Sequence, residues 1–497
     1  MAQSKSSIYQ PPQFIDDERS EKIEHFLSTI KDYFQYNYET NKFPGLAYGL
    51  IVDGELIDSN SFGYINLERK LPTTHQSLFR IASMTKSFTA MAIIKLRDDG
   101  KLRLDDPVSD YIPELNQTNF LTNDSPILTI RHLLIQNCGM PEDDSWADRQ
   151  LSVNDNDFLK MLNKGISLSN PPDTIWEYTN LGYAMLGRII TVVAQQSFQD
   201  YIKQEILLPL DMKNTFWEYD DIHPDQLAHG YRWQSERYLE EELLHDGTYG
   251  AMGGLISSIE DFSKYVSYHL QAWPARTASE YGPIRRSSLR EMHHPWNFIG
   301  IHPQAENSPI VVTSAYCYGL IWSKTTDGII SINHTGGLPG FGSNWMILPE
   351  YGIGLVSFSN STYADLYHIN GIILEQFVKL GNLQTRQLSN SYYLSQRKDQ
   401  LIDVLIKSKW NQSTSKFDDI FAENFFLDHD LELRKKTADD FLNQIGTIIS
   451  IRPLIPKNQL RGDFHIEGEH ATLQISFSLS PENPPLIQEL KFTKHCK

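Results

Sequence analysis

The chain has 497 residues, of which 40% are hydrophobic and 21% charged; this is ordinary globular usage and enough for about two to four domains. Its 62 acidic residues outnumber 44 basic ones, for a formal net charge of −18. This acidic balance argues against nucleic acid or an anionic membrane as a partner.

The cysteines and the N-terminus bear on the compartment. Cys138, Cys317 and Cys496 lie far apart, without metal-ligand spacing, and their odd number argues against a disulfide framework. The N-terminal segment lacks the apolar core of a signal peptide, and no run of about 18 apolar residues predicts a membrane span. We therefore expect a cytoplasmic protein with reduced thiols.

The first expected elements are a helix and a hairpin. Residues 1–20 form a polar lead-in, and Ser20 can cap a helix whose apolar side chains recur every three or four residues from Ile23 onward. Residues 45–52 and 56–64 then alternate as two strands around Asp53-Gly54, which is a strong hairpin signal.

The middle of the chain is expected to be helical. Residues 81–99 predict a buried helix that stops at Gly100, a favoured residue just past a helix end. Thr129 can cap a helix that runs through Ile135. Residues 181–196 are apolar nearly all round, which is typical of a buried helix.

Strands return near residues 329–333, 344–348 and 353–358, joined by turns rich in glycine or proline. Strands at both ends with helices between them favour an α+β fold, in which an antiparallel sheet carries flanking helices and a helical subdomain. We expect this domain to occupy residues 21–380. A polar linker should follow at 381–399, and a small α+β accessory domain at 400–497.

A nucleophile is suggested by the pattern Ser-x-x-Lys, which is weak alone because the chain contains it four times: Ser28/Lys31, Ser83/Lys86, Ser395/Lys398 and Ser413/Lys416. Context favours Ser83, which stands between an apolar approach and the buried helix. Lys86 would lie on the same side one turn later, where burial lowers a lysine pKa enough for it to accept a hydroxyl proton. On spacing alone, a helix cap beside a solvated lysine is the favoured interpretation of Ser83.

Two further segments carry polar groups that suit acyl transfer. Tyr178 and Asn180 lie two apart, so in an extended loop they point the same way; a phenol can act as a base and an amide can orient a carbonyl. A core tyrosine beside a helix cap is the competing interpretation of that pair. His334 and Gly336 would share one side of a strand, and the N–H of Gly337 could join that of Ser83 in an oxyanion hole.

Ser-x-x-Lys, Tyr-x-Asn and His-x-Gly, in this order and about 95 and 155 residues apart, resemble the signature of the class C β-lactamases and penicillin-binding-protein-like serine hydrolases. The segments 96–107 and 253–262 also resemble that family, and the likeness spans roughly residues 25–380. The resemblance implies that Ser83 forms an acyl-enzyme, that Lys86 and Tyr178 act as base and then acid, and that no metal or organic cofactor is needed.

The resemblance further implies substrate contacts from Asn180, His334 and Gly336, with the N–H groups of Ser83 and Gly337 as oxyanion hole. The sequence departs from the family at two places. Residue 334 is a histidine where β-lactamases and cell-wall peptidases usually have lysine, so a positive charge is expected only below about pH 6.5. Residues 136–139 read Gln-Asn-Cys-Gly where the family often has His-Thr-Ser-Gly, and we expect an altered pocket there.

These observations favour a hydrolase of small esters, amides or peptides, esterase- or peptidase-like. A β-lactamase or D-Ala-D-Ala carboxypeptidase is the first alternative, because it shares the motifs. A non-catalytic binding or assembly module on the same fold is the second, suggested by the unusual 136–139 loop and the additional domain. The partners that we expect are a small substrate and a second copy of the chain, and we expect the accessory domain either to pack near the site or to mediate that homodimer.

Overall fold

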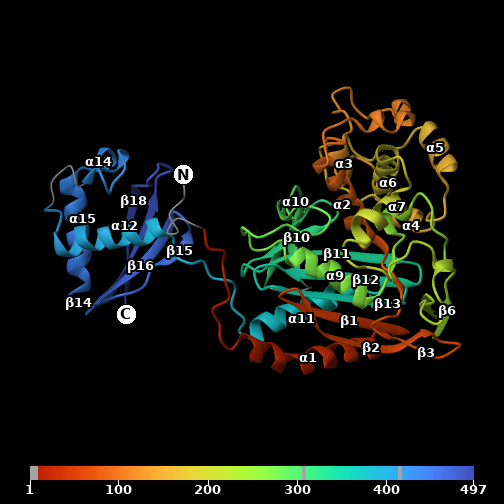
Figure 1. Cartoon of the computed structure of the whole chain (residues 1–497), viewed down its shortest axis with the longest axis horizontal. Helices are drawn as coiled ribbons and strands as arrows, with labels where there is room; N and C mark the ends of the chain where they lie inside the picture. The colour runs from red at the N-terminus through yellow and green to blue at the C-terminus, as the bar shows by residue number, and fades with distance from the viewer. Residues whose placement is uncertain (1–8, 305–308, 412–416, 497) are drawn as a thin grey trace. The chain divides into compact units, whose positions relative to one another are not determined.

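The computed structural model describes residues 9–304, 309–411 and 417–496. The chain divides into two units (Figure 1): residues 16–385 form one, and residues from Arg386 onward form the other together with residues up to Ile15. A bridge between Gln13 and Gln387 joins the two segments of the second unit. The expected linker at 381–399 is only partly irregular, because helix α12 begins inside it at Tyr392.

A nine-stranded sheet forms the centre of the larger unit, and each pair of neighbouring strands in it is antiparallel. Its order is β3-β2-β1-β13-β12-β11-β10-β9-β8, so the first strands of the chain lie beside the last strands of the unit (Figure 1). The predicted fold class is therefore confirmed. The strands are β1 Gly45–Val52, β2 Glu55–Asn66, β3 Leu71–Pro72, β8 Asn297–Pro303, β9 Val311–Tyr316, β10 Ile321–Thr325, β11 Ile330–Leu338, β12 Phe341–Leu348 and β13 Ile353–Ser359.

The turn between β1 and β2 is the predicted hairpin. Asp53 and Gly54 both have positive φ, at 51° and 92°, and Val52 pairs with Glu55. A two-residue turn of this kind matches the twist of the flanking strands and favours Asp-Gly, because both central residues need left-handed backbone.

One face of the sheet is covered by α1 Arg19–Thr40 and α11 Leu366–Leu380 (Figure 1). The apolar face of α1 is buried at three- and four-residue intervals, as predicted from Ile23 onward. Its Phe26 stacks on Phe377 of α11 at 5.2 Å, and its Phe34 stacks on Tyr48 of β1 at 4.1 Å. The helix begins at Arg19, one residue before the serine that was expected to cap it.

The other face is covered by α9 Ile259–Leu270 and by a helical region in which α2 Thr85–Asp98, α6 Asn180–Ala194 and α8 Gly250–Gly253 pack together. Gly100 follows α2 with φ of +74°, as predicted for a residue past a helix end, and Thr129 caps α3 with a capping box. The larger unit also contains shorter α-helices and small two-stranded sheets. The helices are α3 Ile130–Leu134, α4 Asp144–Ala147, α5 Asp155–Asn163, α7 Phe198–Ile202 and α10 Arg286–Met292. The small sheets pair β4 Phe79–Arg80 with β7 Ile256–Ser257, and β5 Tyr231–Gln234 with β6 Arg237–Glu240.

The smaller unit is α+β, as predicted. Strands β14, β16, β17 and β18 pair in that order, and β15 pairs with β16. Helices and sheet share an apolar core of their own. The elements are α12 Tyr392–Ile402, α14 Asn424–Asp428, α15 Leu431–Ile445, β14 Ile448–Ile451, β15 Ile455–Asn458, β16 Arg461–Gly468, β17 Ala471–Leu479 and β18 Ile487–Cys496.

Candidate active site

Ser83 lies in a tight 3-10 turn, Ala82–Met84, between β4 and α2 rather than on the first turn of the α-helix itself. The turn is held on both sides: the Ile81 N–H donates to the Leu255 carbonyl at 3.0 Å, and the Ile81 carbonyl accepts from the Ser343 hydroxyl at 2.7 Å. Ala82 has φ of +49°, a left-handed backbone that costs a side-chain-bearing residue about 1 kcal/mol or more. The surroundings thus hold the turn that carries Ser83 in a fixed position, with backbone strain at Ala82.

Lys86 lies one turn beyond Ser83 and is fully buried. Its ammonium donates to the Ser83 hydroxyl at 3.0 Å, the Asn180 side-chain oxygen at 2.6 Å and the Met252 carbonyl at 2.9 Å. Burial lowers the pKa of Lys86 to about 8, although nearby carboxylates, Asp144 foremost, oppose the shift. At that pKa about a tenth of the lysine is neutral at pH 7 and free to accept a proton.

Tyr178 precedes α6 and turns its ring toward the lysine. The Lys86 nitrogen lies 4.9 Å from the ring centroid. Burial raises the pKa of Tyr178 well above its ordinary value, and a hydrogen bond with Ser83 only partly offsets that shift. The phenol is therefore neutral here, which suits a proton donor and relay better than a first base.

Asn180, the first residue of α6, connects Lys86 to a carboxylate that the sequence patterns missed. Its side-chain oxygen accepts from Lys86, while its amide N–H donates to Asp144 at 2.7 Å. Asp143 accepts the backbone N–H groups of Asn180 at 2.6 Å and Leu181 at 3.0 Å, and so caps α6. Both ends of the Asn180 amide are engaged within the protein.

A third acidic residue completes this group. Asp148 is buried and accepts a hydrogen bond from the Tyr363 hydroxyl at 2.9 Å. Burial raises the pKa of Asp148 to about 7, against the lowering effect of that bond. The acidic segment from residue 142 to 148 was the available signal, yet nothing in its spacing indicated that it would lie near Lys86.

Gln136, in the loop where the sequence departs from the family, holds the Tyr-x-Asn segment in place. Its side-chain amide donates to the Thr179 carbonyl and accepts the Thr179 N–H, both at 3.0 Å. Thr179 is the residue between Tyr178 and Asn180. Gln136 is fully buried and has φ of +57°. The altered loop therefore positions the site through two hydrogen bonds to the backbone of Thr179.

His334 is buried and makes two hydrogen bonds. Its Nδ1 is 2.6 Å from the Thr335 carbonyl, which can only accept, so Nδ1 carries the proton and Nε2 accepts from the Tyr316 hydroxyl at 3.2 Å. Burial, and after it the charge of Lys86, lowers the pKa of His334 to about 3. The expectation of a positive charge below about pH 6.5 is therefore wrong, because the low-polarity surroundings disfavour the imidazolium.

Gly336 and Gly337 lie on β11 beside the nucleophile turn. A side chain at Gly336 would meet the Ile81 carbonyl and the Ser343 hydroxyl at 2.2 Å, so the space is filled by the protein and not left open to a substrate. A side chain at Gly337 would meet the Tyr363 ring at 2.8 Å. Strand β10 pairs with β11 only as far as Asn333, which leaves His334 onward without a β10 partner.

The other Ser-x-x-Lys matches lack this setting. Ser28 is exposed on α1, and Lys398 donates to the Arg452 carbonyl rather than to Ser395. Ser413 and Lys416 lie outside the described residues. Within the described ranges, the side chains spaced to share a metal ion are Glu218, Asp220 and His245, and none of these belongs to the site at Ser83. No described helix has both the length and the apolar character needed to cross a bilayer.

The sequence of this chain is similar to those of known proteins. The family model Beta-lactamase matches residues 29–376. Protein flp of Staphylococcus aureus (strain MW2) is 26% identical over 69% of this chain and 65% of its own length, and Beta-lactamase-like protein 2 of Dictyostelium discoideum is 31% identical over 49% and 46%. The alignments thus span less than two thirds of these relatives.

Two solved structures have the same fold. The octameric penicillin-binding protein homologue from Pyrococcus abyssi aligns with a TM-score of 0.59 and 20% identity over 95% of this chain and 96% of its own. A penicillin-binding protein from Bacillus halodurans aligns with a TM-score of 0.55 and 23% identity over 69% and 98%. The match to the family model covers most of the chain, which therefore belongs to the Beta-lactamase family of serine hydrolases.

Proposed function

We propose that the chain hydrolyses small esters or amides through an acyl-enzyme on Ser83. The observation that carries the proposal is the hydrogen bond from the buried Lys86 to the Ser83 hydroxyl at 3.0 Å, with a lysine pKa of about 8. A nucleophile in contact with a desolvated base is the arrangement that acyl transfer needs.

The steps follow from the contacts. Neutral Lys86 takes the hydroxyl proton as Ser83 Oγ bonds to the substrate carbonyl carbon, and the N–H groups of Ser83 and Gly337 stabilise the resulting oxyanion. The bond to the leaving group breaks, and the Tyr178 phenol gives that group a proton and regains one from Lys86. A water then attacks the acyl-enzyme by the same route in reverse and releases the acid.

The charges around the site support a substrate without a carboxylate beside the reacting carbonyl. His334, at the place where a lysine would bind such a carboxylate, is neutral above about pH 4, because its pKa is about 3. Asp143 and Asp144, which both accept hydrogen bonds from Asn180, add negative charge near Lys86. We therefore favour an esterase- or peptidase-like activity over a β-lactamase or D-Ala-D-Ala carboxypeptidase, whose substrates carry that carboxylate.

Covalent labelling with two active-site probes tests this proposal. The full chain is treated with a fluorescent fluorophosphonate and, separately, with a fluorescent penicillin. We expect the first to label wild type and not Ser83→Ala, and the second to label weakly. Ser395→Ala, which removes the serine of another Ser-x-x-Lys match, is the control and should label like wild type.

The outcomes separate the alternatives. Strong penicillin labelling would favour the β-lactamase or carboxypeptidase activity. Failure of wild type to take either label would favour the non-catalytic module. The hydrogen bond between Ser83 and Lys86 counts against that module, since a binding function has no need for a buried lysine with a lowered pKa.

The cysteines support a reducing compartment, and we keep the cytoplasm as the proposed location. All three are free thiols; Cys138 and Cys317 are buried and Cys496 is exposed. The octamer is a property of the Pyrococcus abyssi homologue. For this chain, self-association stays a proposal that light scattering on the purified protein would test.

A further inference from the structure

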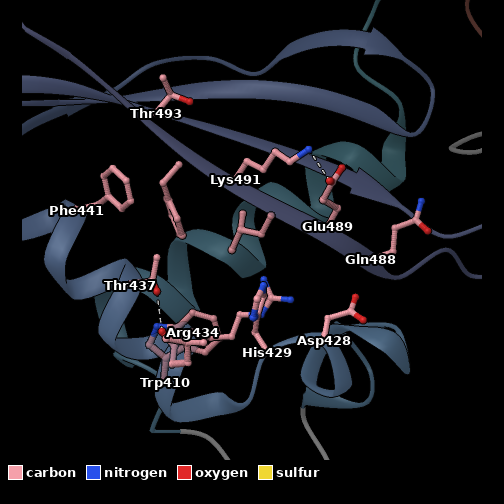
Figure 2. A pocket seen from close by; sticks show the side chains of 13 residues that line it. Trp410, Asp428, His429, Arg434, Thr437, Phe441, Gln488, Glu489, Lys491 and Thr493 are labelled. Atoms are coloured by element: carbon pink, nitrogen blue, oxygen red, sulfur yellow. Dashed lines mark hydrogen bonds and ion pairs between the residues drawn. The ribbon is translucent and has the colours of Figure 1, made fainter.

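The smaller unit contains a cleft of about 620 Å³ that shares no residue with the site at Ser83. This volume is in the range of small-molecule sites, roughly 300–1,000 Å³. Helix α15 and strand β18 form two of its walls, and Figure 2 shows Arg434 and Phe441 on the helix and Lys491 on the strand. Its lining includes Trp410, Asp428, Arg434, Phe441, Lys491 and Phe492.

Trp410 is held in the wall of this cleft at a cost. It is only 4% exposed, and it and Lys409 both have left-handed backbone, with φ of 62° and 47°. Such conformations are strained in residues with side chains. The ring stacks on Phe421 at 6.0 Å, yet its indole N–H is buried with no hydrogen-bond partner among the described residues. A buried tryptophan N–H ordinarily has an acceptor.

Arg434 provides a second unsatisfied donor in the same cleft. One terminal N–H donates to the Phe425 carbonyl at 2.7 Å, and the guanidinium carbon lies 3.8 Å from the centroid of the Phe425 ring. The Nε atom is buried without a partner, and within the described ranges no carboxylate lies at ion-pair distance. Burial lowers the pKa of Arg434, although Asp428 opposes this shift.

The rest of the lining adds apolar surface, the carboxylate of Asp428 and a pair of opposite charges. Phe441 of α15 stacks on Phe492 of β18 at 5.6 Å, which joins the two walls through aromatic rings. Lys491 pairs with Glu489 at 2.6 Å, so these two charges offset each other. Arg434 is therefore the cation of the cleft that still has a donor to offer.

We propose that this cleft binds a small monocarboxylate with an apolar or aromatic body. A carboxylate has two acceptor oxygens. One would accept from the terminal Nη1 of Arg434, which has no partner among the described residues, and the other from the buried indole N–H of Trp410, once the walls of the cleft shift enough to expose it. Arginine is well suited to such a group, because its donors are fixed in a planar fork and its charge is permanent. The body of the ligand would lie against the Phe441 and Phe492 rings.

Isothermal titration of the full chain tests the proposal. The probes are 4-phenylbutyrate and octanoate, each compared with its primary amide, and the protein carries Ser83→Ala so that the catalytic serine takes no part. We expect saturable binding of the acids and at least tenfold weaker binding of the amides, because a charge-assisted hydrogen bond is worth about 1.5 to 3 kcal/mol.

Three variants assign the binding to residues. Arg434→Met keeps the apolar stem and should weaken the acids about 10- to 100-fold; Trp410→Phe keeps a ring, removes the N–H and should weaken them about three- to tenfold. Lys491→Met is the matched control, since its charge is already paired, and should stay within about twofold. Circular dichroism and thermal unfolding check that each variant is folded.

The proposal is overturned by any of three results. These are no saturable binding of either acid, equal affinity for acid and amide, or unchanged affinity in folded Arg434→Met. The titration measures binding and requires no turnover. The result of the titration is therefore independent of whether the hydrolase proposal holds.

Discussion

Lys86 is fully buried, yet the three hydrogen bonds that it donates all go to uncharged oxygens. The carboxylate of Asp144 reaches Lys86 only through Asn180: it accepts a hydrogen bond from the Asn180 amide N–H, while the oxygen of that amide accepts from Lys86. This arrangement keeps the ammonium solvated by dipoles without a direct ion pair that would fix its charge. A lysine pKa of about 8 is the result, and it is what makes Lys86 usable as a base near neutral pH.

The first prediction concerns the pH dependence of catalysis. The active form needs neutral Lys86, whose fraction rises about tenfold per pH unit below its pKa and levels off above it. We expect kcat/KM for a neutral p-nitrophenyl ester to rise from pH 6 to about 8 and to level off near pH 9, after subtraction of the Ser83→Ala background. Asp148→Asn removes a charge that raises the lysine pKa, so the rise should move to lower pH. A flat profile from pH 6 to 9 would argue against Lys86 as the base.

A second prediction concerns His334, whose pKa of about 3 leaves it neutral throughout the range in which the enzyme is assayed. In His334→Gln we expect kcat/KM to change while the shape of its pH profile between pH 5 and 8 stays the same. Loss of a titration near pH 6.5 in the variant would show that the histidine is charged after all.

The third prediction concerns Gln136, which acts through Thr179 and does not touch the reacting atoms. Gln136→Ala leaves a buried N–H and a buried carbonyl unpaired, at a cost of about 2 to 4 kcal/mol in the free energy of unfolding. Displacement of Tyr178 and Asn180 should lower kcat roughly a hundredfold, with a smaller change in KM. Asn137→Ala is the control from the same loop, because it contacts Asp173 instead. Equal kcat losses in both variants would mean a general loss of structure.

Among the elements, the contact between β11 and the nucleophile turn sets the geometry of the site. Gly336 lets the strand approach Ile81 closely, and Gly337 is the next residue along that strand. The Ile81 carbonyl also accepts a hydrogen bond from Ser343 on the neighbouring strand β12, so two strands of the sheet hold the turn. Glycine at 336 is thus explained by the packing of two elements of the protein, which a sequence pattern alone cannot distinguish from room for a substrate.

The fourth prediction tests this contact. In Gly336→Ala the new methyl group would meet backbone, so the strand or the turn must move; we expect a loss of about 1 to 3 kcal/mol in stability and roughly tenfold or more in kcat/KM. Gly300→Ala on β8 of the same sheet has open space around it and should alter stability by less than about 1 kcal/mol. Thermal unfolding and ester hydrolysis measure both variants. Wild-type activity in Gly336→Ala would contradict the proposed close contact.

For the molecule as a whole, local signals in the sequence predicted local structure. The spacing of apolar residues predicted α1, Asp-Gly predicted the hairpin at Asp53, and Gly100 predicted the end of α2. Ser83 and Lys86 were predictable as a pair because three residues make nearly one helical turn. The antiparallel sheet with flanking helices followed from the order of the elements along the chain.

Contacts between distant segments were not predictable in this way. Asp144 meets Asn180, and Asp148 meets Tyr363, only because the chain folds back on itself. The charge state of His334 depends on burial by neighbours that periodicity does not identify. The same holds for residues 9–15, which join the smaller unit through a bridge to Gln387.

Trapping of the acyl-enzyme tests the proposed chemistry at its key atom. The full chain is mixed with p-nitrophenyl acetate, quenched in acid within the first turnover and digested for mass spectrometry. We predict one acetyl group on the peptide that contains Ser83 in wild type, and none on that peptide in Ser83→Ala. An acetyl group on another serine, or release of nitrophenol by wild type with no acylated Ser83 at any quench time, would contradict catalysis through Ser83.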